Sequence, residues 1–228
     1  KQNEFFKKSL IKDWRNGMKH NIPISATFNL FQYLNVTPSI NLSDRMYTMK
    51  VRRSWDPNAS TEVMDTSYSF YNVFDFNASL SLDTKVYGFF KPWRKLFGDK
   101  VSMIRHVMTP TLTVSAAPDF GSPTWGYYGR YEYMNSQGKM VERQYSMFPN
   151  SLFGVPGSGK SGIVSLSLAN NVEMKVKSKN DSIGERKISL IENLTLSQSY
   201  NFAADSLNWS NLQANLLLRL AKNFNLNL

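Results

Sequence analysis

The clearest chemical signature in this sequence is a phosphate-loop motif, Gly-Val-Pro-Gly-Ser-Gly-Lys-Ser, at residues 154–161. Its defining positions are occupied by Gly154, Gly159, Lys160 and Ser161. In nucleotide-binding proteins such a loop follows a buried strand and leads into a helix, because backbone amides and the helix N-terminus together hold the phosphates. Taken alone, the motif predicts a nucleotide-binding site.

The residues around the motif do not provide that context. Pro149 and Asn150 stand where the preceding buried strand should be, which indicates a loop. After the motif, between Gly162 and Ser178, apolar residues recur at every second position, whereas a helix would show spacings of three and four. We therefore interpret the motif as a chance match in a glycine-closed loop that leads into a strand, and we predict no cofactor site there.

Other catalytic chemistry has few candidate residues. The chain contains no cysteine, which excludes disulfides, thiolate nucleophiles and cysteine-based metal sites. Its two histidines, His20 and His106, lie far apart in the sequence and leave little for a metal site or a Ser-His-Asp arrangement. We predict that both are structural and that the protein holds no metal.

Alternation of apolar and polar residues recurs along most of the chain and predicts an all-β protein of about ten strands. A long loop region between about 118 and 162, rich in Gly, Tyr and Pro, is expected to contain a hairpin. No composition shift marks a linker, so we expect residues 1–228 to form one segment without an internal domain boundary. The predicted strands are 22–30, 34–42, 47–52, a weak one near 68–70, 74–86, 104–114, 164–176, 188–202, 212–220 and 224–228.

Many of these strands have nine or more residues, whereas strands of soluble sheets usually have five or six. A transmembrane strand needs about 9 to 11 residues with alternating faces, so strand length favours an antiparallel transmembrane β-barrel. The alternative is a soluble sandwich or barrel, but its outer face should be rich in Lys and Glu, and here Ser, Thr and Asn dominate. The tryptophans near inferred strand ends also fit a membrane interface.

No run of residues approaches the length of a membrane helix, and the first eight residues do not form a signal peptide. The chain is therefore expected to be cytosolic, or else a processed or partial chain. Its formal net charge is +10. Basic charge with many aromatics also suggests nucleic-acid binding, but no such motif or basic stripe is present, and we expect no nucleic-acid partner.

Several segments resemble the LptD family of lipopolysaccharide-assembly proteins, as found in Bacteroidota-type bacteria. The resemblance is carried by the string Asn-Phe-Ala-Ala-Asp-Ser-Leu-Asn-Trp within residues 199–210, by 187–194, by the run from Phe153 to Val176, and by 105–110 with 117–120. It implies an outer-membrane β-barrel that receives lipopolysaccharide from periplasmic Lpt bridge proteins and inserts it into the outer leaflet. It also implies a plug lipoprotein of the LptE type, contact with outer-membrane lipids, and no enzymatic activity.

Two features depart from the full family pattern: no periplasmic jellyroll is recognisable, and ten strands are too few for so large a barrel. We therefore expect an internal portion of the barrel, and the same alternation leaves a general outer-membrane porin or transporter as the alternative function. Basic residues on the polar face could attract phosphorylated headgroups, or simply pair with anionic lipids and acidic neighbours. The residues predicted to face the lumen are Arg105, Ser165, Ser167, Lys175, Ser197 and Arg219.

Overall fold

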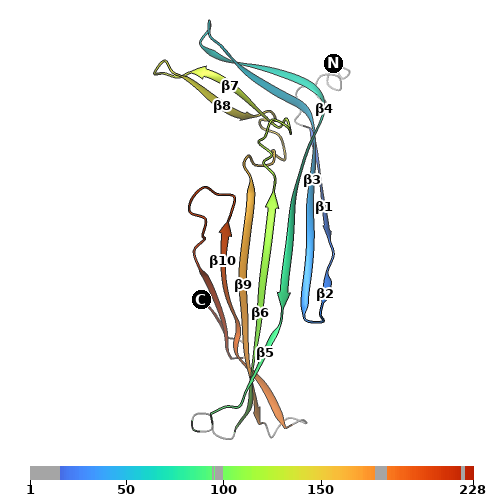
Figure 1. Cartoon of the computed structure of the whole chain (residues 1–228), viewed down its shortest axis with the longest axis vertical. Coiled ribbons are helices and arrows are strands. Elements are labelled where there is room, and N and C mark those ends of the chain that lie inside the picture. Colours follow the sequence, from blue (N-terminus) through green and yellow to red (C-terminus); the bar gives the residue numbers. More distant parts are fainter. Residues whose placement is uncertain (1–15, 94, 96–99, 178–183, 222–223) are drawn as a thin grey trace. The chain divides into compact units, whose positions relative to one another are not determined.

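The structure is a computed structural model that describes residues 16–93, 95, 100–177, 184–221 and 224–228 (Figure 1). These residues form mainly β-strands, and no helix among them has the length and apolar character needed to cross a membrane. The strands are β1 (Gly17–Ser25), β2 (Phe28–Leu30), β3 (Leu34–Asp56), β4 (Thr61–Thr84), β5 (Val86–Phe90), β6 (Val101–Ala117), β7 (Tyr128–Met134), β8 (Met140–Ser146), β9 (Ser161–Lys177), β10 (Glu185–Asn201), β11 (Gln213–Ala221) and β12 (Phe224–Asn227).

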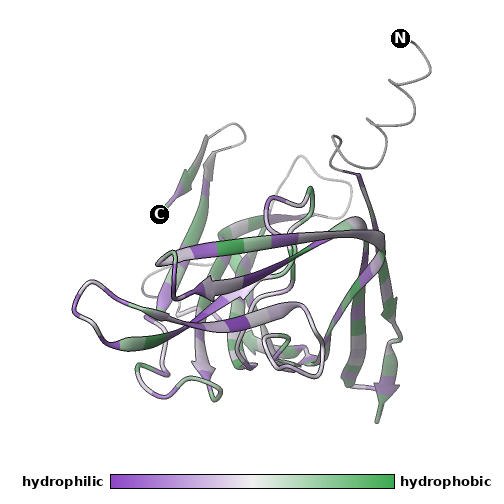
Figure 2. Ribbon diagram, turned by 90° about the horizontal axis from the view of Figure 1, so that it is seen from above, coloured by the Kyte–Doolittle hydropathy of each residue, from purple (hydrophilic) through white to green (hydrophobic). Residues whose placement is uncertain are grey.

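Ten of these strands form one sheet, in the order β1-β3-β4-β6-β9-β10-β11-β12, with β2 paired to β3 and β5 paired to β6. The pairs are antiparallel, which confirms the predicted all-β antiparallel class. A second, two-stranded sheet consists of β7 and β8 and lies within the predicted loop region, where a hairpin was expected. Apolar and polar residues are mixed along the same strands (Figure 2).

Strands β3 and β4 are longer than the sequence predicted. Residues 34–42 and 47–52 were expected to be separate strands, but β3 continues through both. The separate strands near 68–70 and over 74–86 are likewise one strand, β4, as far as Thr84. Both predictions were wrong about where strands end, although the turn after β3, at residues 57–60, overlaps the turn expected at residues 55–58.

β3 continues through an interruption of its apolar alternation, and the charged side chains at that point contact β4. Asp44 and Arg45 break the apolar alternation, and they look like turn residues in the sequence. In the structure Arg45 forms an ion pair with Asp75, and the Asn72 amide donates to Asp44 at 2.6 Å. Because these side chains find partners on the neighbouring strand, the backbone continues without a turn.

The chain divides into two compact units. The first comprises 1–24, 39–78 and 116–161, and the second comprises 25–38, 79–115 and 162–228. In the first unit, five buried apolar residues form a cluster: Tyr47, Val73, Phe120, Tyr127 and Phe148. Three of them come from the long connection between β6 and β9, so this connection is folded onto β3 and β4.

The second unit contains the β9–β10 hairpin that the alternation predicted. The two strands pair from Glu185↔Lys177 to Asn201↔Ile163, with irregularities after Ser189 and Ile191. The turn predicted at 179–184 lies outside the described residues except for Gly184, which has a positive φ of 71°. The hairpin fixes which residues of β9 and β10 share a face.

Candidate functional site

The polar residues predicted to face a lumen lie on one face of the sheet in the second unit. Ser167 is directly opposite Ser197, and Ser165 is opposite Ser199. Residues opposite each other in an antiparallel pair share a face, and alternate residues along a strand share it too. Lys175 therefore lies on the same face as Ser165 and Ser167. We call this surface the polar face.

A charged cluster extends the polar face to β6. Arg105 of β6 contacts Glu173 of β9 at 2.5 Å, so it projects to the same side. Lys175 contacts Glu185 of β10 at 3.3 Å. Arg105, Glu173 and Lys175 border a pocket of about 290 Å³, together with Lys187 and three apolar residues, Phe89, Met103 and Met174. Sequence reasoning identified Arg105 and Lys175 but missed their acidic partners, which are set by register between strands.

Arg219 lies on the same face at the other side of β10. The pairing of Leu217 with Asn193 and of Gln213 with Ser197 places odd-numbered residues of β11 on the polar face. Arg219 contacts Glu192 at 3.8 Å. The structure thus brings all six residues predicted for the lumen to one face of the sheet.

The opposite face carries large apolar side chains that remain uncovered. Leu80, Leu112 and Leu166, from three different strands, are 40%, 37% and 56% exposed. An extended apolar surface of this kind marks contact with lipid or another partner, and in a membrane barrel it is the lipid-facing side. His106 also has this orientation, and its Nε2 lies 3.0 Å from Asn170 Oδ1, which agrees with a structural role.

The phosphate-loop motif lies in the first unit and leads into a strand. Ser161 is the first residue of β9, so the expected strand follows the motif, where a nucleotide-binding protein would have a helix. The Gly159 amide donates to Asp119 Oδ1 at 2.7 Å, and the Gly121 amide donates to the same oxygen at 2.8 Å. These two amide hydrogen bonds lower the pKa of Asp119, with a smaller contribution from the charge of Lys160. A carboxylate of the chain therefore occupies the motif's anion-binding amide.

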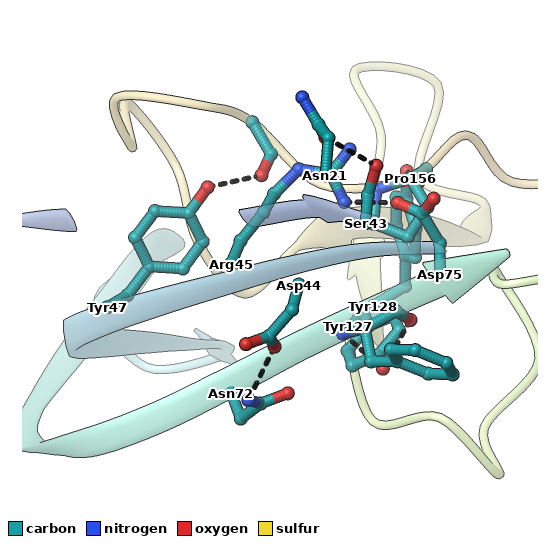
Figure 3. Close-up of polar contacts among 12 residues, drawn as sticks. Asn21, Ser43, Asp44, Arg45, Tyr47, Asn72, Asp75, Tyr127, Tyr128 and Pro156 are labelled. Carbon is teal, nitrogen blue, oxygen red and sulfur yellow. Dashed lines mark hydrogen bonds and ion pairs between the residues drawn. The ribbon is translucent and has the colours of Figure 1, made fainter. Parts of the chain in front are cut away.

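Two tyrosines hold the carbonyl groups of this loop. The Tyr47 hydroxyl donates to Gly154 O at 2.6 Å, and the Tyr128 hydroxyl donates to Pro156 O at 2.7 Å (Figure 3). Burial raises the pKa of Tyr128, so the donor stays protonated. The loop is thus fixed by its own chain on both its amide and its carbonyl groups.

An ion pair that sequence reasoning did not identify lies beside the loop. Arg45 and Asp75 form this pair, and the Arg45 side chain is only 10% exposed (Figure 3). Both residues line an open pocket of about 500 Å³ together with the loop residues 155–161. The only sign of this pair in the sequence is that charged residues interrupt the apolar alternation within β3. That interruption had suggested the end of a strand.

Two further tyrosines bond to strand backbone. The Tyr127 hydroxyl accepts from the Phe74 amide and donates to the Phe74 carbonyl, at 2.9 and 2.8 Å. The Tyr145 hydroxyl does the same at Arg53, at 2.8 and 3.3 Å. No local sequence pattern predicts these contacts, because the partners are 53 and 92 residues apart in the sequence.

The tryptophans differ in their surroundings. Trp93 and Trp209 are exposed near strand ends, as an interfacial position requires. Trp125, in contrast, packs on Phe120 with ring centroids 4.9 Å apart, beside the buried cluster of the first unit. Within the part of the chain that the structure describes, no group of three or more potential metal ligands is present.

A long-stranded antiparallel sheet with one polar face and one exposed apolar face belongs to the class of outer-membrane β-barrel proteins. The sequence matches the family described as LptD protein over residues 1–228, and the chain belongs to this family. LptD proteins are outer-membrane β-barrels that act in lipopolysaccharide transport and assembly, and they are not an enzyme family. Searches of curated proteins and of solved structures gave no match.

Family membership sets the localisation and the pathway. The protein is located in the outer membrane, and its partners include lipopolysaccharide and the Lpt pathway in general. The resemblance noted in the sequence is confirmed, and a soluble sandwich is excluded by the family.

Proposed function

We propose that this chain forms part of the barrel wall of a translocon that inserts lipopolysaccharide into the outer leaflet. In this proposal residues 1–228 are a single internal portion of a larger barrel, the polar face lines the lumen, and the face of Leu166 contacts lipid. The observation that supports it is the gathering of all six predicted lumen residues on one face, opposite exposed leucines, in a member of the LptD family.

The chemistry of the polar face suits a large sugar-bearing substrate. Serine hydroxyls such as those of Ser167 and Ser197 both donate and accept hydrogen bonds, so they can exchange partners with passing sugar hydroxyls. Arg105 and Lys175 add charge-assisted hydrogen bonds to phosphate groups. The hydroxyl contacts are individually weak, which allows the sugars to pass, and the few charge-assisted contacts hold the phosphate groups more strongly.

The proposal includes a plug lipoprotein of the LptE type inside the barrel and delivery by periplasmic Lpt bridge proteins. It also assigns an orientation. Antiparallel strands place the start of β9, which follows the long connection 118–160, at one end of the sheet, and the end of β9 at Lys177 and the start of β10 at Glu185, which a short connection joins, at the other. Outer-membrane barrels have short periplasmic turns and longer extracellular loops, so we place 118–160 on the outside of the cell.

Site-specific crosslinking in the full-length protein tests this function. A photo-crosslinking residue at Ser167 or Ser197 is expected to capture lipopolysaccharide or the plug. Leu166 is the matched control, because it neighbours Ser167 on the opposite face. Lipopolysaccharide captured at Ser167 should disappear when delivery from the periplasm is stopped, whereas capture at Leu166 from the surrounding leaflet should persist. Failure at every position of the polar face would refute the proposal.

Conductance separates the translocon from the alternative of a general porin. A plugged translocon should not conduct when the purified full-length protein is placed in a planar bilayer with its lipoprotein, whereas an open porin conducts freely. A steady large conductance in the presence of the lipoprotein would favour the porin.

A further inference from the structure

We infer that the charged pocket between β5, β6, β9 and β10 binds the phosphorylated head of lipopolysaccharide, a step that rests on the proposed function. This pocket is bordered by Phe89, Met103, Arg105, Glu173, Lys175 and Lys187. It lies entirely within the second unit, towards the end of the β9–β10 pair where Lys177 is opposite Glu185. In the orientation proposed above, this is the periplasmic end of the polar face, where a substrate delivered from the periplasm arrives.

The part of the polar face around the pocket carries an excess of positive charge. Register places Lys177 opposite Glu185 and Lys175 opposite Lys187, all on the polar face. Together with Arg105, this part of the face carries four cations against the two carboxylates Glu173 and Glu185. Charge complementarity therefore selects an anionic ligand.

Two lysines at the pocket stand directly opposite each other on neighbouring strands. Like charges directly opposite each other on neighbouring strands are destabilising, and Lys175 and Lys187 stand in that position. Lys175 is compensated by Glu185 at 3.3 Å, but Lys187 makes no ion pair with another residue that the structure describes. A phosphate held between the two ammonium groups would remove the repulsion and supply the missing partner.

Apolar side chains also lie among these cations. Phe89 is directly opposite Arg105, and Met103 is two residues before it, so both lie on the polar face. Both are exposed. A free phosphate would gain nothing from them, whereas a phosphate attached to a lipid would cover both surfaces. This combination selects a phosphorylated lipid, and the proposed function makes that lipid lipopolysaccharide.

The pocket volume of about 290 Å³ is at the lower end of the usual range for small-ligand sites. It accommodates a phosphate with its adjoining sugar, and the rest of the molecule extends from the pocket. Such a site is suited to receiving one part of a larger lipid as it passes.

The test uses the full-length protein with its lipoprotein, reconstituted in vesicles and supplied with lipopolysaccharide through the periplasmic bridge. A photo-crosslinking residue at Met103 is expected to capture lipopolysaccharide. The double variant K175Q/K187Q should reduce this capture by about tenfold or more, because each lost charge-assisted hydrogen bond is worth over 1 kcal/mol. K175R/K187R should retain it, and K139Q, a lysine of the β7–β8 turn, should leave it unchanged. Lipopolysaccharide with its lipid phosphates removed should give as little capture as the double glutamine variant.

The crosslinking results distinguish failure of this site from failure of the proposed function. Capture at Ser167 without capture at Met103 would refute this site while leaving the proposed function intact, and loss at both positions would refute both. Equal capture by the wild type and K175Q/K187Q, or a crosslinked mass of a glycerophospholipid, would also overturn the site. Heat-modifiable gel mobility of each variant checks that the barrel has folded, and K175R/K187R provides the comparison if the glutamine variant has not.

Discussion

The hydroxyl of Tyr127 bonds to both backbone groups of Phe74, accepting from its amide at 2.9 Å and donating to its carbonyl at 2.8 Å. A neighbouring strand would normally supply these two bonds. Tyr145 makes the same pair of bonds with Arg53. Unpaired strand edges invite unwanted pairing, and here the long connection 118–160 satisfies them with side chains. This connection is therefore a structural clamp on β3 and β4.

Replacing Tyr127 with Phe should loosen the clamp. The ring would still pack in the buried cluster, but the Phe74 amide and carbonyl would lose their partner, which costs about 1 to 3 kcal/mol for a partly buried group. We expect a lower unfolding temperature of the full-length barrel and faster proteolytic cleavage within 118–160. Tyr133→Phe is the control, because its ring packs on Trp55 and its hydroxyl makes no hydrogen bond to a described residue. Equal stability of the two variants would show that the hydroxyl of Tyr127 does not hold the connection.

Breaking the Arg45–Asp75 pair should be more costly. Removing one partner leaves an uncompensated charge in a poorly solvated position, and such changes destabilise by about 3 to 5 kcal/mol. Arg45→Met and Asp75→Leu should therefore each reduce the amount of folded barrel. The double variant should recover much of the loss, because it removes both charges together. Denaturant titration of the four proteins measures the coupling, and additive losses would contradict it.

Strand faces were predictable from the sequence, whereas strand ends were not. Alternation between Ser167 and Leu166 depends only on local geometry, so it shows in the sequence. The continuation of β3 through Arg45 depends on Asp75, thirty residues away, and polar residues without visible partners look like a turn. The predicted number of strands is close to the observed number for one reason only. Predicted strands that merged into one were offset by observed strands that had not been predicted.

In the candidate site, too, some features were predictable from the sequence and others were not. Arg105 and Lys175 were identified because each is a basic residue at an alternate position to the apolar residues of its strand, on the predicted polar face. The opposition of Lys175 and Lys187 requires the register of β9 and β10, which the turn sets and the alternation alone does not fix. The contacts of Tyr127 with Phe74 arise from a long connection folding back, for which no local pattern exists.

Gly162 should resist substitution because the Phe202 ring covers it. A Cβ atom at this position would lie 2.3 Å from the ring of Phe202, far inside van der Waals contact. Gly162→Ala should displace the ring, which is half-exposed, and destabilise the barrel by about 1 kcal/mol, at the lower end of the cost of overpacking. Gly157→Ala is the matched control, since nothing lies within 4 Å of its Cβ position. Thermal unfolding compares the two, and an equally stable Gly162→Ala would show that the ring moves away without cost.

The protein is expected not to bind nucleotide at the phosphate-loop motif. The Gly159 amide that would face a phosphate already donates to Asp119, and a strand begins where the helix should be. Titration calorimetry with ATP and magnesium should give no heat of binding, and Lys160→Ala should give the same result as the wild type. A binding isotherm that Lys160→Ala abolishes would restore the nucleotide-binding interpretation.

The two hydrogen bonds that the Gly159 and Gly121 amides donate to Asp119 should break only in strong acid. Hydrogen bonds from the amides of Gly159 and Gly121 hold the pKa of Asp119 below its usual value, and the charge of Lys160 acts in the same direction. A carboxylate whose pKa is lowered by folding contributes stability above its unfolded pKa of about 3.9, and this contribution is lost as the pH falls through the lower folded value. Protection of the peptide containing Gly159 against hydrogen exchange, corrected for intrinsic rates, should therefore stay constant from pH 7 to about pH 4 and fall below that. In the Asp119→Ala variant this protection should be low at every pH. If the protection of the wild-type protein falls between pH 7 and 5, Asp119 is not the residue that holds the Gly159 amide.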